Sequence, residues 1–341
     1  MRVMDWNIEW MNDWFVGGNR VAFRENYNGI HGDIRNVADL CQRVASVIKT
    51  INPDVLTVQE GPSDKREMEL FINEFLKDEN GAPLFKAFGG FEGRTQKNYN
   101  LVKVEGEFKE AELATDELTL KLNESWLSDI DGDLNLEEYE FTRTPVVVEG
   151  KFGTSDSQLK ILTLHTKSKY VHRQEELWNN PNTRMQFITE AMKNRRRISS
   201  EAMRIRKYLD GLIENNRQEL IVVTGDFNDG PGHDYFERYY LTHNVTDIIL
   251  GSTFQPELLF KHSFINRVPK EKRYTAIFDD FIDEIPSRLL LLDHIVVSPV
   301  LSDKIVNSEI AHNAFNAAID ESATSRQKYP SDHRPVFVDL A

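Results

Sequence analysis

Polar side chains able to bind a metal ion or move a proton stand at the ends of short apolar segments throughout this 341-residue chain. They are carboxylates, amides and histidines: Asn7, Glu9, Glu60, His165, Asp226, Asn228, Asp293, His294, Asp332 and His333. The interior of a buried strand is apolar for packing reasons, whereas side chains at its end lie at the rim of the sheet, where ligands bind. One such residue often caps a turn. Six clusters of them favour a common site.

The chemical make-up of this set favours a hard divalent cation. Several carboxylates crowded together repel one another unless a cation lies among them. Oxygen ligands without cysteine are typical of Mg²⁺ or Mn²⁺ rather than of structural zinc. The only cysteine, Cys41, also rules out an internal disulfide framework.

Hydrophobic periodicity predicts the elements that position these residues. Residues 2–9 alternate as a strand does, with Asp5, Asn7 and Glu9 on the polar face. Further strands are expected at 54–59, 145–149, 160–165, 220–224, 289–298 and 335–340, and helices at 33–52 and 172–216. Strands and helices interleave over the whole length, which predicts a single α/β domain over residues 1–341. We expect an acidic, β-rich insertion around 105–140 and a charged helical insertion around 172–216.

Six motifs occur in a fixed order along the chain. They are Met4-Asp5-Trp6-Asn7-Ile8-Glu9, Pro53-Asp54-Val55-Leu56-Thr57-Val58-Gln59-Glu60, Leu164-His165-Thr166-Lys167-Ser168-Lys169, Gly225-Asp226-Phe227-Asn228-Asp229-Gly230-Pro231, Leu292-Asp293-His294-Ile295 and Ser331-Asp332-His333-Arg334-Pro335. In these motifs the chain resembles the endonuclease/exonuclease/phosphatase superfamily, which includes DNase I-like nucleases, apurinic-site endonucleases, inositol-polyphosphate 5-phosphatases and neutral sphingomyelinases. The resemblance implies a four-layer α/β/β/α sandwich of two packed mixed sheets and metal-dependent hydrolysis of phosphoesters.

The same resemblance implies a metal site. Glu60 corresponds to the principal Mg²⁺ (or Mn²⁺) ligand, Asn7 lies beside it, and Asp332 completes the shell, partly through water. Glu9 stands where many members have aspartate, and its side chain is one methylene longer.

The resemblance also implies catalytic roles. Asp226 corresponds to the carboxylate that orients or deprotonates the attacking water, and Asn228 to the amide that holds a phosphate oxygen. His333 corresponds to the histidine at the scissile phosphate, Asp293 to the carboxylate that orients it, and His165 to a second histidine facing the phosphate. Histidine titrates near neutral pH, so either Asp226 or His333 can be the general base as far as the sequence shows.

The leading hypothesis is a nuclease that hydrolyses DNA or RNA, with nucleic acid as its partner. The predicted substrate-binding residues are Arg143, which opens an Arg-x-Pro motif, Lys167, and Arg196 and Arg197 in the basic segment 193–207; Lys169 and Arg173 add charge after His165. The net charge of −14 is a counterweight, although thirteen acidic residues and only two lysines in 105–140 hold most of the excess.

Two alternatives remain open. One is a phosphatase or phospholipase-type phosphodiesterase acting on inositol phosphates or sphingomyelin. The other is an inactive binding scaffold, which is disfavoured because every expected polar position holds a competent residue.

The segment 129–140 spaces its acids as an EF-hand loop does, with Asp129, Asp131, Asp133, Asn135 and Glu140 at positions 1, 3, 5, 7 and 12. Leu134 occupies the position that needs glycine, so we favour a tight Asp-Gly hairpin turn over a Ca²⁺ loop. No run of 18 apolar residues is present. The first residues, Met1-Arg2-Val3-Met4, form no apolar leader, so we expect a cytoplasmic protein; an exported form whose leader has been removed stays open as the alternative. No protein partner is evident.

Overall fold

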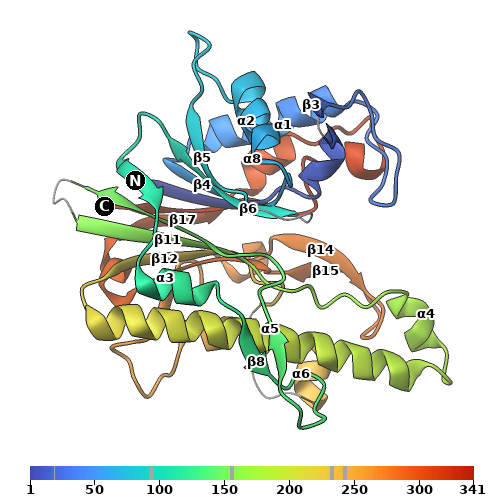
Figure 1. Ribbon diagram of the computed structural model, residues 1–341. Helices are drawn as coiled ribbons and strands as arrows, with labels where there is room; N and C mark the ends of the chain where they lie inside the picture. Colours follow the sequence, from blue (N-terminus) through green and yellow to red (C-terminus); the bar gives the residue numbers. More distant parts are fainter. Residues whose placement is uncertain (19, 92–95, 154–156, 231–233, 241–243) are drawn as a thin grey trace.

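The alternating strands assemble into two six-stranded sheets in the computed structural model (Figure 1). The structure describes residues 1–18, 20–91, 96–153, 157–230, 234–240 and 244–341; Pro231, the last residue of the fourth motif, lies outside them. The first sheet has the order β17 (Ile305–Ile310), β18 (Val336–Leu340), β1 (Arg2–Asn7), β4 (Val55–Gly61), β6 (Lys97–Lys103) and β5 (Phe85–Gly89). The second has the order β13 (Lys261–His262), β16 (Asp293–Val297), β12 (Leu220–Asp226), β11 (Ser157–His165), β10 (Val146–Phe152) and β7 (Phe108–Leu113).

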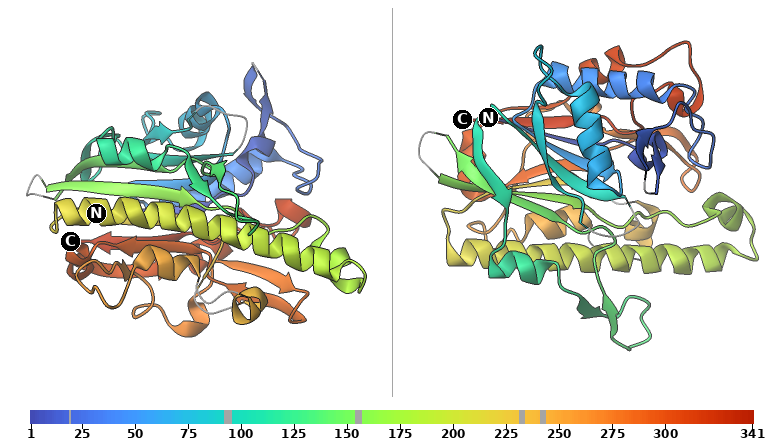
Figure 2. Two further views of the ribbon diagram at one scale, coloured as in Figure 1. Left: turned by 60° about the horizontal axis from the view of Figure 1, so that its bottom comes forward. Right: turned by 45° about the horizontal axis from the view of Figure 1, so that its top comes forward.

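Helices cover the outer faces of both sheets. The helices α1 (Val37–Ile51), α2 (Lys65–Phe75) and α8 (His312–Ala317) pack on the first sheet. The long helix α5 (Arg184–Asn215) and the short α7 (Val245–Leu250) pack on the second; Figure 2 shows α5 lying along it. The predicted four-layer α/β/β/α sandwich is therefore confirmed. No helix in the described ranges has both the length and the apolar character needed to cross a bilayer.

The layer between the two sheets changes from apolar to charged along the strands. Every second residue of a strand points into it. At the end near the chain termini these residues are apolar: Val3, Val55, Val102, Ile161, Val222 and Val297. Two positions further along they are mostly neutral polar, with one acid: Asp5, Thr57, Asn100, Thr163 and Thr224, all 0% exposed. Two further positions along stand the residues of the motifs: Asn7, Gln59, Asn98, His165, Asp226 and Asp293.

Strand register brings the last of these positions to one edge. β1 runs parallel to β4, with Asn7 opposite Gln59. β11 runs parallel to β12, with His165 opposite Asp226, and β16 returns antiparallel so that Asp293 also lies opposite Asp226. This edge is the one away from the two chain termini (Figure 1).

Three expectations from the sequence need correction. The strand expected at 289–298 is two strands in different sheets, because the chain turns at 291–292, where the Thr275 hydroxyl accepts the amides of Leu292 and Asp293. The first of them, β15 (Ile285–Leu290), pairs with β14 (Ala276–Asp280) in a separate hairpin. The helix expected at 172–216 is two helices, α4 (Gln174–Asn179) and α5.

The third correction concerns the acidic segment 105–140. It contains β7, the short helix α3 (Glu117–Leu122) and a hairpin of β8 (Trp126–Ser128) and β9 (Glu137–Tyr139). The hairpin is present, but residues 129–136 make a longer loop than the tight turn expected. The Asp129 carboxylate accepts the amides of Gly132 and Leu134 and organises that loop.

Glycine is required at position 225 because β12 approaches the backbone of its neighbour β11 closely there. Its φ is +146°, and a Cβ there would lie 2.0 Å from the Leu164 carbonyl oxygen. We expect Gly225→Ala to lower the free energy of unfolding by about 3 kcal/mol or more, because both backbone strain and overlap with a backbone atom oppose it. The control is Gly81→Ala, where φ is +84° but no atom lies within 4 Å, and which should cost only about 1 kcal/mol. Urea unfolding of both variants measures the difference, and equal losses would contradict the argument.

Candidate active site

Asn7, at the end of β1, joins the two sheets. Its amide nitrogen donates to Glu60 Oε1 at 3.3 Å within its own sheet and to Asp226 Oδ2 at 3.0 Å in the opposite sheet. Its amide oxygen accepts the Glu9 backbone N–H at 3.1 Å, and its backbone carbonyl accepts the Ser331 hydroxyl at 2.7 Å. The Asn7 amide is 1% exposed and its hydrogen bonds fix its orientation.

Glu60 is turned toward the site by an irregularity in β4. The pairing of β4 with β6 shifts register between Val58 and Gly61, and Glu60 has a φ of 58°. Its Oε2 accepts the Trp10 amide at 2.9 Å and the Gln96 side-chain amide at 2.5 Å. Positive φ values recur at Glu9 (25°) and Asn228 (50°), and backbone strain of this kind clusters at functional sites.

Glu9 is held by a residue that the sequence did not indicate. Arg326 is 7% exposed, and its guanidinium lies 3.3 Å from Glu9 Oε1 and 2.6 Å from Asp13 Oδ2. The other Glu9 oxygen accepts the Asp332 backbone N–H at 3.1 Å. Glu9 therefore links β1 to the Ser331–His333 segment, more than three hundred residues away in the chain.

These carboxylates fit a divalent cation. The pKa of Glu9 is raised to about 8, chiefly by burial and next by the negative charge of Asp332, with Glu60 adding to the rise. The positive charge of Arg326 opposes it. Acids whose ionised forms oppose one another in this way are stabilised by a cation between them, and carboxylate oxygens are ligands that Mg²⁺ and Mn²⁺ prefer. As metal ligands Asn7, Glu9, Glu60 and Asp332 remain predictions, and the Asn7 side chain turns its amide nitrogen rather than its oxygen toward Glu60.

A second cluster lies directly beneath. One ligand atom each from Asp226, Asp293 and His333 lies within 4.8 Å of the others, and all three residues are buried. His333 Nδ1 is 2.7 Å from Asp293 Oδ2. The Trp6 indole donates to the His333 carbonyl at 2.8 Å, and this bond fixes the backbone that carries the imidazole.

The protonation of this cluster is set by its charges. Burial disfavours the imidazolium of His333, but the carboxylates of Asp293, Asp332 and Asp226 outweigh burial and raise the pKa of His333 well above its ordinary value. Burial also raises the pKa of Asp226 to about 7, with Asp293 adding to the rise and His333 opposing it. The arrangement favours a cationic His333 beside an Asp226 that titrates near neutral pH.

His165 and Asn228 flank Asp226. His165 Nε2 lies 3.4 Å from Asp226 Oδ2. Burial, together with the positive charges of Arg143 and His333, lowers the pKa of His165 well below its ordinary value. The Asn228 backbone N–H donates to Asp226 Oδ1 at 2.7 Å, and its side chain donates to the Thr166 carbonyl at 3.1 Å.

A chain of neutral histidines supports the turn after Asp226. The Phe264 N–H donates to His262 Nδ1 at 3.1 Å, so His262 Nε2 carries the proton and donates to His294 Nδ1 at 2.9 Å. His294 Nε2 then donates to the Asp229 carbonyl at 2.7 Å. Burial lowers the pKa of both imidazoles. His294 thus points to the face of β16 opposite to that of Asp293 and positions the backbone near Asn228.

Asp5 is a further buried acid that the sequence placed on the polar face without assigning it a role. Its Oδ1 accepts the Thr57 hydroxyl at 2.5 Å and the Gln59 amide at 2.8 Å. Burial, and next the charge of Asp293, raise the pKa of Asp5 well above its ordinary value. It holds the polar layer beneath the site together.

Most of the basic residues expected to meet substrate have partners within the protein. Lys169 is enclosed by the carboxylates of Asp229, Asp234 and Glu237, and Arg173 pairs with Glu176. In α5, Arg204 and Arg206 donate to backbone carbonyls of other segments, Arg195 donates to Asp234, and Arg206 also pairs with Asp210 of the same helix. These arginines stabilise the fold through their partners within the protein. The structure therefore does not support the interpretation that they form a free basic surface along 193–207.

The four predicted substrate-binding residues differ in their surroundings. Arg197 donates to the Glu140 carbonyl at 2.7 Å and lies over the Tyr139 ring, and Arg196 packs against Gly132. Arg143 donates to the Thr166 carbonyl at 3.2 Å and its charge acts on His165, and Lys167 donates to the Ser168 carbonyl at 2.9 Å. As substrate contacts, all four remain predictions.

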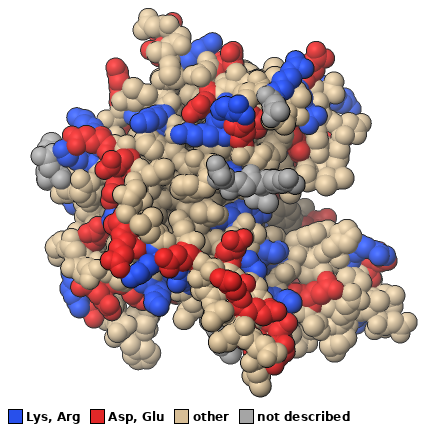
Figure 3. Space-filling model, viewed as in Figure 1, with Lys and Arg blue, Asp and Glu red and all other residues tan. Residues whose placement is uncertain are grey.

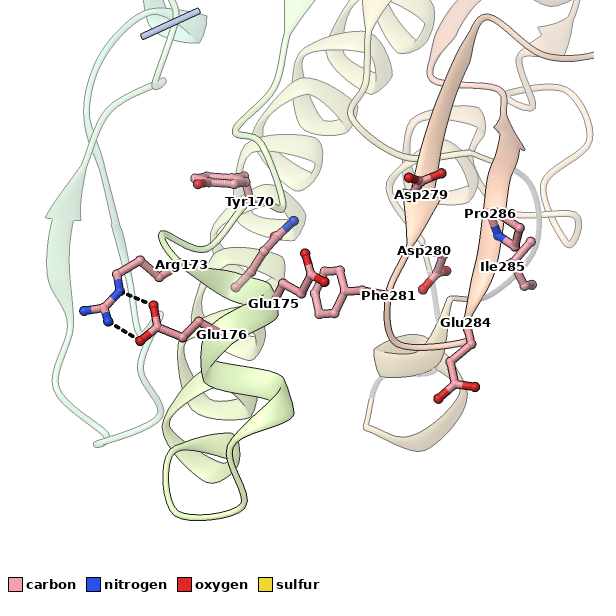
Figure 4. Close-up of a pocket in the computed structure, with 11 residues that line it drawn as sticks. Tyr170, Arg173, Glu175, Glu176, Asp279, Asp280, Phe281, Glu284, Ile285 and Pro286 are labelled. Carbon is pink, nitrogen blue, oxygen red and sulfur yellow. Dashed lines mark hydrogen bonds and ion pairs between the residues drawn. The ribbon is translucent and has the colours of Figure 1, made fainter.

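One hollow has none of the predicted metal-binding or catalytic residues among its described lining residues. It has a volume of about 720 Å³ and lies between α4 and the β14–β15 hairpin (Figure 4). Glu175 and Glu176 line one wall and Asp279, Asp280 and Glu284 the other. The molecule is hollowed on the same side, between the parts that carry α2 and α4, and acidic and basic side chains are interspersed over this face (Figure 3).

No protein-family model matches the sequence, and no curated protein shows significant sequence similarity to it. Solved structures do resemble the fold. Truncated TDP2 from Caenorhabditis elegans is 14% identical, with a TM-score of 0.50 over 99% of this chain and 96% of that chain. A mannosyl-6-phosphatase from Bacteroides thetaiotaomicron is 14% identical, with a TM-score of 0.49 over 100% and 99%. An endonuclease/exonuclease/phosphatase family protein from the same bacterium is 14% identical, with a TM-score of 0.46 over 99% and 96%.

At such low identity the likeness concerns the fold. Two face-to-face mixed sheets covered by helices give the chain the DNase I-like fold that its motifs predict.

Proposed function

We propose that this protein is a metal-dependent phosphodiesterase whose substrate is DNA or RNA. One observation carries the proposal. The buried cluster of Asp226, Asp293 and His333 lies against a group of mutually repelling carboxylates, and Asn7 hydrogen-bonds to both groups. Together they offer a cation site, a base and a proton donor within one site, which is the equipment that hydrolysis of a phosphoester requires.

The chemistry divides between these residues. Glu60, Asn7 and Asp332, with Glu9 beside them, would hold a divalent cation, which would supply positive charge at the phosphate oxygens. Asp226, with its pKa of about 7, takes a proton from the attacking water. His333 is held cationic by Asp293 and donates a hydrogen bond to the phosphate as negative charge builds up. Neutral His165 and the Asn228 amide supply further donors on the other side.

A second candidate is a phosphatase acting on a small phosphoester. It is favoured by the enclosure of Lys169 and Arg173 among carboxylates, because a long polynucleotide normally needs a continuous track of free cations. Arg143 and Lys167 beside His165 favour the nuclease, since they place two cations next to the scissile position.

A substrate panel decides between these candidates. We expect supercoiled plasmid, single-stranded DNA or RNA to be hydrolysed with Mg²⁺ or Mn²⁺, and EDTA to abolish the reaction until the metal is restored. Turnover of inositol phosphates or sugar phosphates without cleavage of nucleic acid would favour the second candidate. The absence of turnover on every substrate, with either metal, would leave only an inactive scaffold.

Glu60→Gln tests the cation site. The substitution keeps the size of the side chain but removes its charge, so we expect kcat/KM to fall at least about a hundredfold while the circular dichroism spectrum and Tm stay close to those of the wild type. Glu69→Gln is the control, because Glu69 is half-exposed and pairs only with Lys65. An active Glu60→Gln enzyme would refute the assignment.

The pH profile tests the division of roles between Asp226 and His333. At saturating metal, kcat/KM should rise with pH as Asp226 loses its proton and fall at alkaline pH as His333 loses its own. Asp293→Asn removes the carboxylate that stabilises the imidazolium, so the alkaline limb should move to lower pH while the acidic limb moves little or downward. An alkaline limb that stays in place in Asp293→Asn would contradict a cationic role for His333.

A further inference from the structure

A second, smaller hollow of about 220 Å³ lies next to the catalytic group. It is enclosed by the start of β6 and by the segment that leads into β10. Its described lining residues are polar or aromatic: Phe91, Gln96, Lys97, Asn98, Asn123, Glu140, Phe141, Thr142, Arg143 and Thr144.

The pocket and the catalytic group share a wall. Gln96 lines the pocket and donates to Glu60, the principal predicted metal ligand. Arg143 lines it too, and its guanidinium donates to the Thr166 carbonyl, the same oxygen that the Asn228 side chain uses. A group bound in the pocket would therefore lie beside a phosphate held by Asn228.

Two cations, Lys97 and Arg143, line this pocket, and a third, Lys167, interacts electrostatically with Arg143. Within the described part of the chain, no carboxylate forms an ion pair with Lys97, Arg143 or Lys167. This sets them apart from Lys169 and Arg173, which are paired. Partly buried cations without counter-charges attract an anion.

The nearest acids are engaged elsewhere. The Glu201 carboxylate accepts the Thr142 amide and hydroxyl and the Lys167 amide, so it holds the pocket wall in place. Glu140 is exposed at the rim. Burial lowers the pKa of Lys97, and burial together with the charge of Arg143 lowers the pKa of Lys167, as expected where positive charge is incompletely balanced.

We propose that this pocket binds a second phosphate group of the substrate, adjacent to the phosphate that is hydrolysed. The inference rests on the proposed function, since it takes the scissile phosphate to lie at Asn228 and His333. Lys97 and Arg143 meet the second phosphate directly, and Lys167 adds positive charge at the boundary between the two. The rings of Phe91 and Phe141 offer apolar contact to the carbon skeleton that joins the phosphates. The second phosphate is the neighbouring phosphodiester in a nucleic acid, or another phosphomonoester in a small polyol phosphate.

Paired ligands test the pocket. The inhibition constants of thymidine 3′,5′-bisphosphate and thymidine 5′-monophosphate are measured against hydrolysis of bis(4-nitrophenyl) phosphate, and those of inositol 1,4-bisphosphate and inositol 1-phosphate likewise. Calorimetric titration of the same ligands gives a readout that needs no turnover. We expect one bisphosphate to bind at least about tenfold more tightly than its monophosphate, because a charge-assisted contact is added. Tighter binding of the thymidine bisphosphate would identify the second phosphate as a neighbouring phosphodiester of a nucleic acid, and tighter binding of the inositol bisphosphate would identify it as a phosphomonoester of a polyol phosphate.

Lys97→Met is the decisive variant. It should reduce the advantage of the bisphosphate by about three- to tenfold and leave the affinity for the monophosphate much less affected. Lys103→Met is the matched control, because Lys103 ends the same strand, about 20 Å away, and donates to Asn52; it removes the same charge and should keep the advantage.

The outcomes separate the two proposals. No advantage of either bisphosphate in the wild type, an advantage that survives Lys97→Met, or an equal loss for both ligands in that variant would each overturn the second-phosphate pocket. Failure of the protein to hydrolyse any phosphodiester would instead count against the proposed function, and the calorimetric comparison would still decide the pocket.

Discussion

A single amide holds this site together. Asn7 donates one N–H to a carboxylate of its own sheet and the other to a carboxylate of the opposite sheet, so the distance between Glu60 and Asp226 is set by one planar group. Two carboxylates brought to this separation in a buried setting would repel each other, and the amide places a donor between them. Its own carbonyl oxygens are taken up by Glu9 and Ser331. The motifs at both ends of the chain therefore meet at Asn7.

The interior between the sheets explains how such a polar group is tolerated. Burial of unpaired polar atoms is costly, but here the polarity increases stepwise along the strands. Two residues along the strands from the apolar layer, Thr163 donates to Asn100 of the opposite sheet at 2.7 Å. Asp5, which lies at the same distance from the apolar layer, accepts the Thr57 hydroxyl and the Gln59 amide. The charged residues of the site thus rest on a hydrogen-bonded layer, which in turn rests on the valine- and isoleucine-rich core. Each step is two residues along a strand, which is the period of side chains that share a face.

The sequence predicted this arrangement where the information was local. Period-two alternation placed Asp5, Asn7 and Glu9 on one face, and the order of the six motifs predicted the fold. It failed where tertiary partners decide. Nothing near Arg326 signals that it will pair with Glu9, and the break between β15 and β16 follows from hydrogen bonds to Thr275. The basic run in α5 was misleading because arginines that donate to carbonyls of other segments have the same sequence signature as free ones.

The pKa values of the buried cluster follow from burial and neighbouring charges rather than from residue type alone. In water an aspartate is a far weaker base than a histidine. Here Asp226 is buried close to Asp293, so its anion is disfavoured, whereas His333 faces three carboxylates that stabilise its cation. The environment thus raises both pKa values, that of Asp226 chiefly by burial and that of His333 by the neighbouring carboxylates. Because the same carboxylates serve both effects, substitution of Asp293 alters the two partners in opposite senses: it favours the anion of Asp226 and disfavours the cation of His333.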